Sequence, residues 1–162
     1  MLSYVILSPK IKLFTKKIPI VQTGCKSLAI DAKGRICLPS KLRVHSETYF
    51  VTCGLDAKQN KALWVFTPDR WDAFEKKITD NPRSKSMDVY EFFISSADEL
   101  KIDGNGRILI SQSLRDYAGL SKDIVLWGGS DHIEIWDKSL WDSKVAARDL
   151  GKIFESMDEL GI

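Results

Sequence analysis

Short apolar stretches alternate with polar, glycine-containing segments along much of the chain, and this pattern predicts β-strands joined by loops. Four stretches are rich in β-branched and aromatic side chains and have the length of ordinary strands. The segments between them carry the glycines and polar residues that commonly end strands. The predicted strands cover residues 49–53, 62–66, 124–127 and 132–136.

Helical signals occupy two other parts of the chain. Pro68 suits the first turn of a helix that continues over 69–79, a polar stretch at 80–86 interrupts it, and 87–95 is predicted as a second helix. Near the C-terminus, apolar residues recur with the spacing i, i+3, i+4, i+7 and i+10 of an amphipathic helix. We expect this stripe to pack on its own domain, with a neighbouring subunit as the alternative. Its members are Leu150, Ile153, Phe154, Met157 and Leu160.

An internal repeat is the most informative feature of the chain. Residues 30–36 read IDAKGRI, and residues 102–108, found 72 positions later, read IDGNGRI. The similarity continues in the Leu-Arg pair at 42–43, which matches the Leu-Arg pair at 114–115. A duplicated unit does not bury its apolar face alone, and 162 residues are within the size of one domain. The two copies are therefore expected to share one core.

Each copy of the repeat is predicted to begin with a tight β-hairpin. In the first copy, residues 26–30 suit one strand and residues 35–38 suit its return partner. The Lys-Gly pair at 33–34, and the Asn-Gly pair at 105–106 in the second copy, tolerate the positive φ that a tight hairpin turn needs. A short helix is expected after each hairpin, at 41–43 and at 114–116.

The net charge of +2 conceals an uneven distribution of charged residues. Residues 1–45 hold nine Lys or Arg and one acidic residue, whereas residues 46–162 hold 15 basic and 21 acidic residues. A basic end of this kind favours an anionic partner, and the opposed charges also favour contacts between unlike faces of several copies. The alternative is that these charges only solvate the surface.

The repeated DxxxR motif places an aspartate and an arginine four residues apart across each turn, at the exposed tip of a two-stranded ribbon. An arginine guanidinium matches phosphate oxygens or the O6 and N7 acceptors of guanine, and such a ribbon fits the major groove of DNA. Double-stranded DNA is therefore the expected partner. The alternative is a local role, in which each aspartate accepts turn amides or pairs with its arginine. The motif residues are Asp31, Arg35, Asp103 and Arg107.

Further candidates for contact with DNA lie in or just after the motifs, and they are Lys33, Lys41, Arg43 and Asn105. The first copy concentrates four basic residues in one short stretch when Arg35 is included, so we expect it to bind DNA more strongly than the second. The alternative for Lys33 is an ordinary solvated lysine, and for Asn105 a residue that only serves the turn.

Other kinds of functional site find little support in the sequence. The three cysteines and two histidines form no metal-ligand spacing, so neither a metal nor a cofactor is expected. Residues 103–106 imitate the start of a calcium loop, but Arg107 occupies the next ligand position. Ser95, Ser96 and Asp98 have no histidine nearby in the sequence, so an enzyme is not expected. No apolar run reaches the length of a membrane span, which favours a cytoplasmic protein.

Three features together resemble the MraZ family of bacterial transcriptional regulators: the two DxxxR motifs, the Leu-Pro pair at 38–39, and the segment GGSDHIEIWD at 128–137. The resemblance extends from about residue 21 to residue 141. It implies an α+β fold in which two tandem AbrB/MraZ-like β-hairpin modules fuse into one swapped-hairpin β-barrel with flanking helices. The implied organisation is an N-terminal extension at 1–20, a first repeat at 21–71, a helical connection at 72–96, a second repeat at 97–141 and a C-terminal amphipathic helix at 142–162.

The same resemblance implies a DNA-binding regulator that assembles into closed rings in the cytoplasm and at the nucleoid. The implied target is a set of short, G-containing direct repeats upstream of the division and cell wall gene cluster, and the implied site residues are the four motif residues. Two positions depart from the family pattern: Ser111 stands where proline is usual, and Glu91 where a basic residue is common. These departures predict weaker contact by the second copy. The alternative from another class is an oligomeric protein-interaction scaffold without specific DNA binding.

Overall fold

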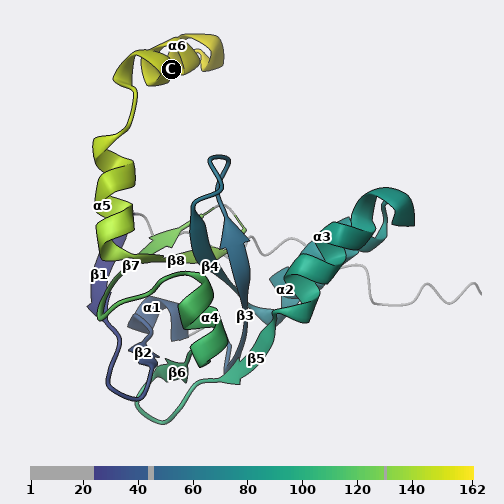
Figure 1. The fold of residues 1–162 in the computed structure, drawn as a ribbon, viewed down its shortest axis with the longest axis vertical. Helices are drawn as coiled ribbons and strands as arrows, with labels where there is room; N and C mark the ends of the chain where they lie inside the picture. The colour runs from purple at the N-terminus through teal and green to yellow at the C-terminus, as the bar shows by residue number, and fades with distance from the viewer. Residues whose placement is uncertain (1–23, 44–45, 130) are drawn as a thin grey trace, which may run out of the picture.

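The computed structural model describes residues 24–43, 46–129 and 131–162, so the expected extension at 1–20 lies outside the described residues. Strands and helices form a mixed α+β arrangement (Figure 1). The strands are β1 (Cys25–Ala29), β2 (Arg35–Cys37), β3 (Thr48–Leu55), β4 (Lys61–Phe66), β5 (Asp98–Lys101), β6 (Arg107–Leu109), β7 (Asp123–Gly128) and β8 (Ile133–Asp137). The helices are α1 (Ser40–Arg43), α2 (Pro68–Thr79), α3 (Arg83–Ser95), α4 (Gln112–Tyr117), α5 (Lys138–Ala146) and α6 (Leu150–Leu160).

Antiparallel pairing arranges the strands in a six-stranded sheet of order β1-β7-β8-β4-β3-β5 and a two-stranded sheet of β2 and β6. Because β1, β3 and β4 are equivalent to β5, β7 and β8 in the repeat, the order reads the same from either edge. At the centre of the large sheet Trp64 lies opposite Glu134, and in the small sheet Ile36 lies opposite Ile108. An approximate two-fold axis through these two pairs therefore relates the copies.

Direct pairing within each predicted hairpin is wrong, because the strands on either side of each turn pair with the other copy. β1 pairs with β7, β5 pairs with β3, and β2 pairs with β6. The glycine turns are present, but a turn determines only where the chain reverses, and it does not select the partner of each strand. Ile36 and Ile108 are both 0% exposed where the two copies meet, so burial of apolar surface favours pairing between copies.

One continuous apolar core lies between the two sheets and receives side chains from α1 and α4 as well. The α+β class with antiparallel strands is confirmed. The predicted closed barrel is not seen in the pairing of residues 24–43, 46–129 and 131–162, because β1 and β5 remain edges of the large sheet.

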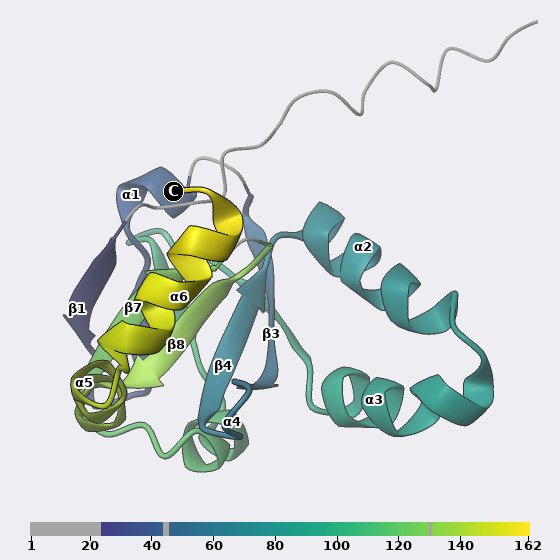
Figure 2. The same ribbon diagram turned by 90° about the horizontal axis from the view of Figure 1, so that it is seen from above.

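The helices extend from opposite sides of the sheet, with α2 and α3 on one side and α5 on the other (Figure 2). Helix α3 begins four residues before its predicted start at 87. Phe93 joins α3 to the body, because its ring stacks on Trp64 at a centroid distance of 5.1 Å and meets Phe74 of α2 edge-on at 5.1 Å. The segment predicted as one C-terminal helix, 142–162, contains the end of α5 and all of α6.

Helix α6 lies at the far end of α5, away from the sheet (Figure 1). Its apolar stripe is exposed, with Leu150 75% and Phe154 69% accessible to solvent. The expectation that this stripe packs on its own domain is therefore wrong for the described residues. The spacing of apolar residues predicts which face of a helix is apolar, but the surface that covers this face depends on the direction in which the chain leaves α5.

Candidate nucleic-acid interface

The two DxxxR turns, between β1 and β2 and between β5 and β6, lie at the same end of the molecule (Figure 1), and the antiparallel β2–β6 pair separates them. In the first turn, the backbone N–H of Asp31 donates to the carbonyl of Arg35 at 3.0 Å, and the N–H of Gly34 donates to the carbonyl of Asp31 at 2.9 Å. The second turn repeats both bonds at the equivalent residues. Glycine is required in both because φ is +87° at Gly34 and +76° at Gly106.

The aspartate of each motif organises its turn. Oδ1 of Asp31 accepts from the amides of Lys33 and Arg35, each at 2.9 Å, and Oδ2 accepts from Nε of Arg35 at 2.6 Å. These bonds, led by the Arg35 amide, lower the pKa of Asp31 to about 2. Asp103 makes the same three bonds, and the amide and side chain of Arg107 lower its pKa in the same way. The local role considered for the aspartates is therefore present.

In each motif, only the Nε edge of the arginine guanidinium is hydrogen-bonded to the described residues. Nε donates to the aspartate, whereas the two terminal nitrogens of Arg35 and of Arg107 make no hydrogen bond to the described residues. Their side chains are 29% and 28% exposed. A pair this exposed contributes little to stability, but it does fix the plane of the guanidinium. The local ion pair and ligand binding are therefore compatible, because the terminal nitrogens are available to a phosphate or a guanine edge.

Arg43 stands close to Arg35 in the sequence, but the structure places it against the second turn. Its Nε donates to the carbonyl of Leu38 at 2.7 Å, and any side chain at Gly106 would overlap its guanidinium. Because β2 pairs with β6 of the other copy, the helix that follows β2, α1, lies at the turn of that other copy. Lys33 and Lys41 are exposed, as is Asn105 in the second turn.

A further arginine, Arg115 of α4, covers the first turn in the same way. A Cβ at position 34 would lie only 2.7 Å from Cζ of Arg115. Each turn is thus covered by the arginine of the other copy's short helix. Sequence reasoning did not single out Arg115 as a site residue, although its match to Arg43 in the repeat was a usable signal.

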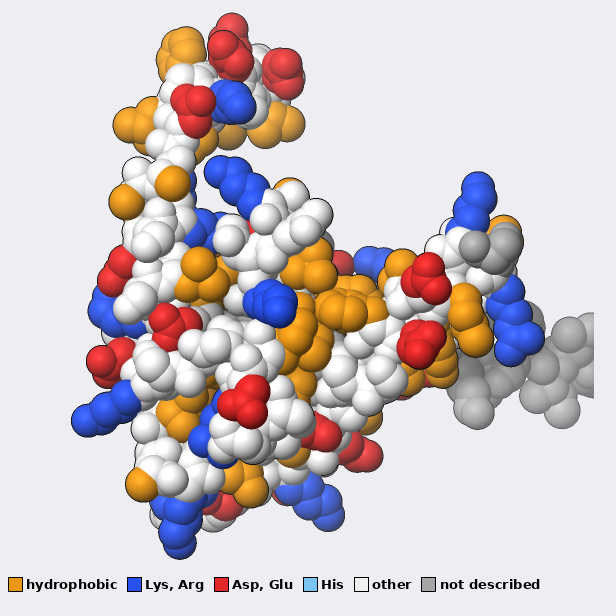
Figure 3. All heavy atoms as spheres, in the orientation of Figure 1, with side chains coloured by type: hydrophobic (Ala, Val, Ile, Leu, Met, Phe, Trp, Pro, Cys, Tyr) orange, Lys and Arg blue, Asp and Glu red, His pale blue; other side chains and the backbone are white. Residues whose placement is uncertain are grey.

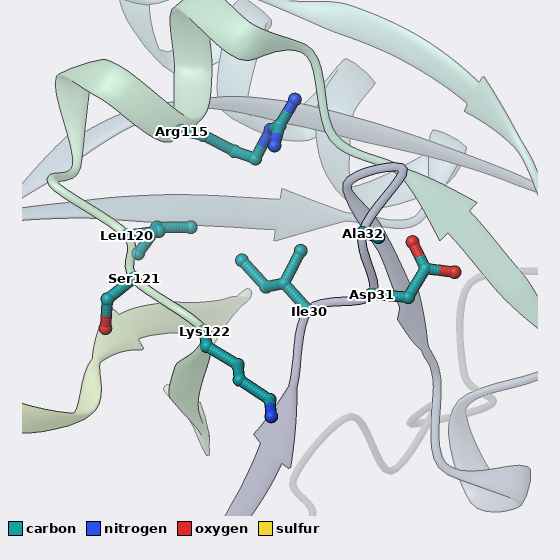
Figure 4. Close-up of a pocket in the computed structure, with 7 residues that line it drawn as sticks. All are labelled: Ile30, Asp31, Ala32, Arg115, Leu120, Ser121 and Lys122. Atoms are coloured by element: carbon teal, nitrogen blue, oxygen red, sulfur yellow. The ribbon is translucent and has the colours of Figure 1, made fainter.

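A pocket of about 520 Å³ separates the first turn from α4 and from the loop before β7. Arg115 and Lys122 are the basic residues that line it, while the Asp31 carboxylate points away (Figure 4). Lys and Arg side chains are also visible at this end of the molecule in the space-filling view (Figure 3). The surface around the first turn therefore offers several cations to an anionic ligand.

The described residues were also compared with the requirements of a metal site, a membrane span and a serine nucleophile. Among these residues, no group of three or more His, Cys, Asp or Glu side chains is placed to hold a metal ion, and no helix is long and apolar enough to span a membrane. The hydroxyls of Ser95 and Ser96 donate to carbonyls of α3, and the Ser96 hydroxyl also accepts from the amide of Cys53 on β3.

Comparison with known proteins matches the chain to one family over most of its length. The family model described as "MraZ protein, putative antitoxin-like" matches residues 22–88 and 93–156. The protein named transcriptional regulator MraZ of Acetivibrio thermocellus is 39% identical over 139 residues, which cover 83% of this chain and 94% of that protein. Proteins of the same name from Lachnoclostridium phytofermentans and Clostridium tetani are each 38% identical, over 82% of this chain and over 92% and 94% of their own lengths. The chain therefore belongs to the MraZ family.

Proposed function

We propose that this chain is a non-enzymatic, sequence-specific DNA-binding regulator of transcription that contacts DNA through its two DxxxR turns. The observation that carries this proposal is the arrangement of Arg35 and Arg107, which their aspartates orient while their terminal nitrogens have no partner among the described residues. A fork held in this way is suited to the O6 and N7 acceptors of guanine or to a backbone phosphate. The names of the relatives support the same role.

The small number of base-reading side chains on each chain supports assembly of several copies on one DNA segment. We assign to this protein a closed ring of subunits that binds short, G-containing direct repeats in its own upstream region, at the division and cell wall gene cluster. In this role it acts at the nucleoid. The exchange of strands between copies supports the swapped-hairpin arrangement that the family resemblance implies.

An oligomeric protein-interaction scaffold is the second candidate, and the apolar stripe of α6 favours it. Leu150 and Leu160 are 75% and 74% exposed, and nothing in the described part of the chain covers them. An exposed apolar helix face of this kind commonly marks a contact with another protein chain. The same face also suits self-association of a DNA-binding ring, so α6 alone does not decide between the candidates.

Salt dependence separates the two candidates in one titration. The protein is titrated with a duplex from its own upstream region and with a scrambled duplex of the same composition, at several salt concentrations. We expect preference for the upstream duplex, with log K falling against log[salt] with a slope of about −0.9 per phosphate contact. Equal, weak binding to both duplexes, with little dependence on salt, would favour the scaffold.

A further inference from the structure

The two turns are alike in shape, but the charged groups placed beside them differ. We propose that the first turn is the principal phosphate-binding site of the chain. Arg115 and Lys122 bind the DNA backbone there, and the second turn binds phosphate weakly. This inference rests on the proposed function and names which half of the interface carries the electrostatic contact.

Lys122 and Glu47 occupy equivalent places beside the two turns. The N–H of Ile30 donates to the carbonyl of Lys122 at 2.8 Å, and the N–H of Ile102 donates to the carbonyl of Glu47 at 2.9 Å. Both side chains are exposed. The approximate two-fold symmetry therefore places a cation next to one turn and an anion at the same position next to the other.

The two covering arginines are also held differently. Arg43 is anchored by its Nε–H, which donates to the carbonyl of Leu38. The Nε–H of Arg115 is buried and has no hydrogen-bond partner among the described residues. A buried donor without a partner is costly, and Arg115 lines a pocket wide enough for its guanidinium to turn toward an acceptor. A phosphate oxygen is an acceptor of the required kind.

The tips of the two turns also differ, because Lys33 of the first corresponds to Asn105 of the second. Lys41, which shares α1 with Arg43, and Lys101, which precedes the second turn, add positive charge there. The proposed difference in phosphate binding therefore rests on where Arg115 and Lys122 lie and not on the total charge of each turn. Asp31 also lines the pocket, but its carboxylate points away from it (Figure 4) and is bound by the Arg35 side chain and two amides. The remaining polar side chain, Ser121, donates its hydroxyl to a carboxylate of β8.

This difference has a consequence for the DNA sequence that suits the protein. Two equal sites related by a two-fold axis fit a palindrome, because the symmetry of an operator mirrors that of the protein. A strong turn beside a weak one gives each chain a direction on the duplex. Repeats that all run in the same direction therefore suit this module better than inverted repeats do.

Matched neutralising variants test the inference on the full-length protein and its upstream duplex. Lys122→Gln is compared with Lys85→Gln, which removes the same charge from the exposed surface of α3. We expect Lys122→Gln to weaken binding ~5- to 10-fold and to reduce the salt slope by about one, and Lys85→Gln to change neither. Arg115→Gln should likewise weaken binding more than Arg43→Gln, with folding checked by thermal unfolding.

The outcomes are distinct. If the unmodified protein does not bind the upstream duplex, the proposed function fails. If it binds, but Lys122→Gln behaves as Lys85→Gln does, Lys122 makes no specific contact with the DNA backbone and the inference is overturned. Arg115 covers the backbone of the first turn, so if thermal unfolding shows that its variant is destabilised, the comparison at Lys122 decides alone.

Discussion

Replacing Arg35 and Arg107 together by alanine is expected to abolish specific DNA binding while the fold is retained. Each guanidinium is held by one edge on an aspartate, so its terminal nitrogens are the groups that remain for the ligand. A bidentate contact with guanine contributes ~1–3 kcal/mol, and the loss of two contacts per chain compounds over several chains. Of the single variants, Arg35→Ala should weaken binding more than Arg107→Ala.

Titration with the upstream duplex measures this loss, and circular dichroism with thermal unfolding checks the fold. Arg83→Ala is the matched control, because Arg83 is an exposed arginine at the start of α3 and far from the turns in the chain. We expect the control to bind as the unmodified protein does. Undiminished binding by a folded double variant would remove the DxxxR turns from the interface.

Introducing a charge into the apolar stripe of α6 is expected to dissociate the assembly. Phe154 is 69% exposed and touches no other element of the described chain closely enough to bury it. Phe154→Glu should therefore leave the folded body intact but prevent the stripe from packing on a second copy. Because linked sites raise avidity ~10²–10⁴-fold, DNA binding should fall by a comparable factor.

Light scattering gives the mass of the assembly directly. Ser156→Glu adds the same charge to another exposed position of α6 and is the control that should keep the assembly. A mass that Phe154→Glu does not change would show that the stripe is not the contact between copies.

The strands and the motif geometry followed from local pattern, whereas the pairing of strands did not. Alternation of apolar residues and the glycine turns predicted β1 and β2, and the DxxxR spacing predicted the local bonds of Asp31. No local signal says that β2 pairs with β6 of the other copy, because alternation of apolar residues shows which side chains are buried and not which strand covers them. The burial of Ile36 against Ile108, where the two copies meet, favours this pairing.

The position of Arg43 also depends on the exchange between copies. Arg43 follows Arg35 closely in the sequence, but the exchange carries α1 to the second turn and α4 to the first. The charge of each turn is therefore set by residues of both copies, and a sum over one short stretch of sequence misjudges it. The repeat alignment of Arg43 with Arg115 held the information needed to identify the second covering arginine.

Contact between the turns and DNA is measured most directly by site-specific photo-crosslinking. A photoreactive p-benzoylphenylalanine replaces Lys33 at the tip of the first turn, Asn105 at the tip of the second, or Lys85 on α3 as the control; all three positions are exposed. Irradiation with the upstream duplex should give strong crosslinks from position 33, weaker crosslinks from position 105 and none from position 85. Crosslinks from position 85 with none from positions 33 and 105 would contradict DNA binding by the DxxxR turns.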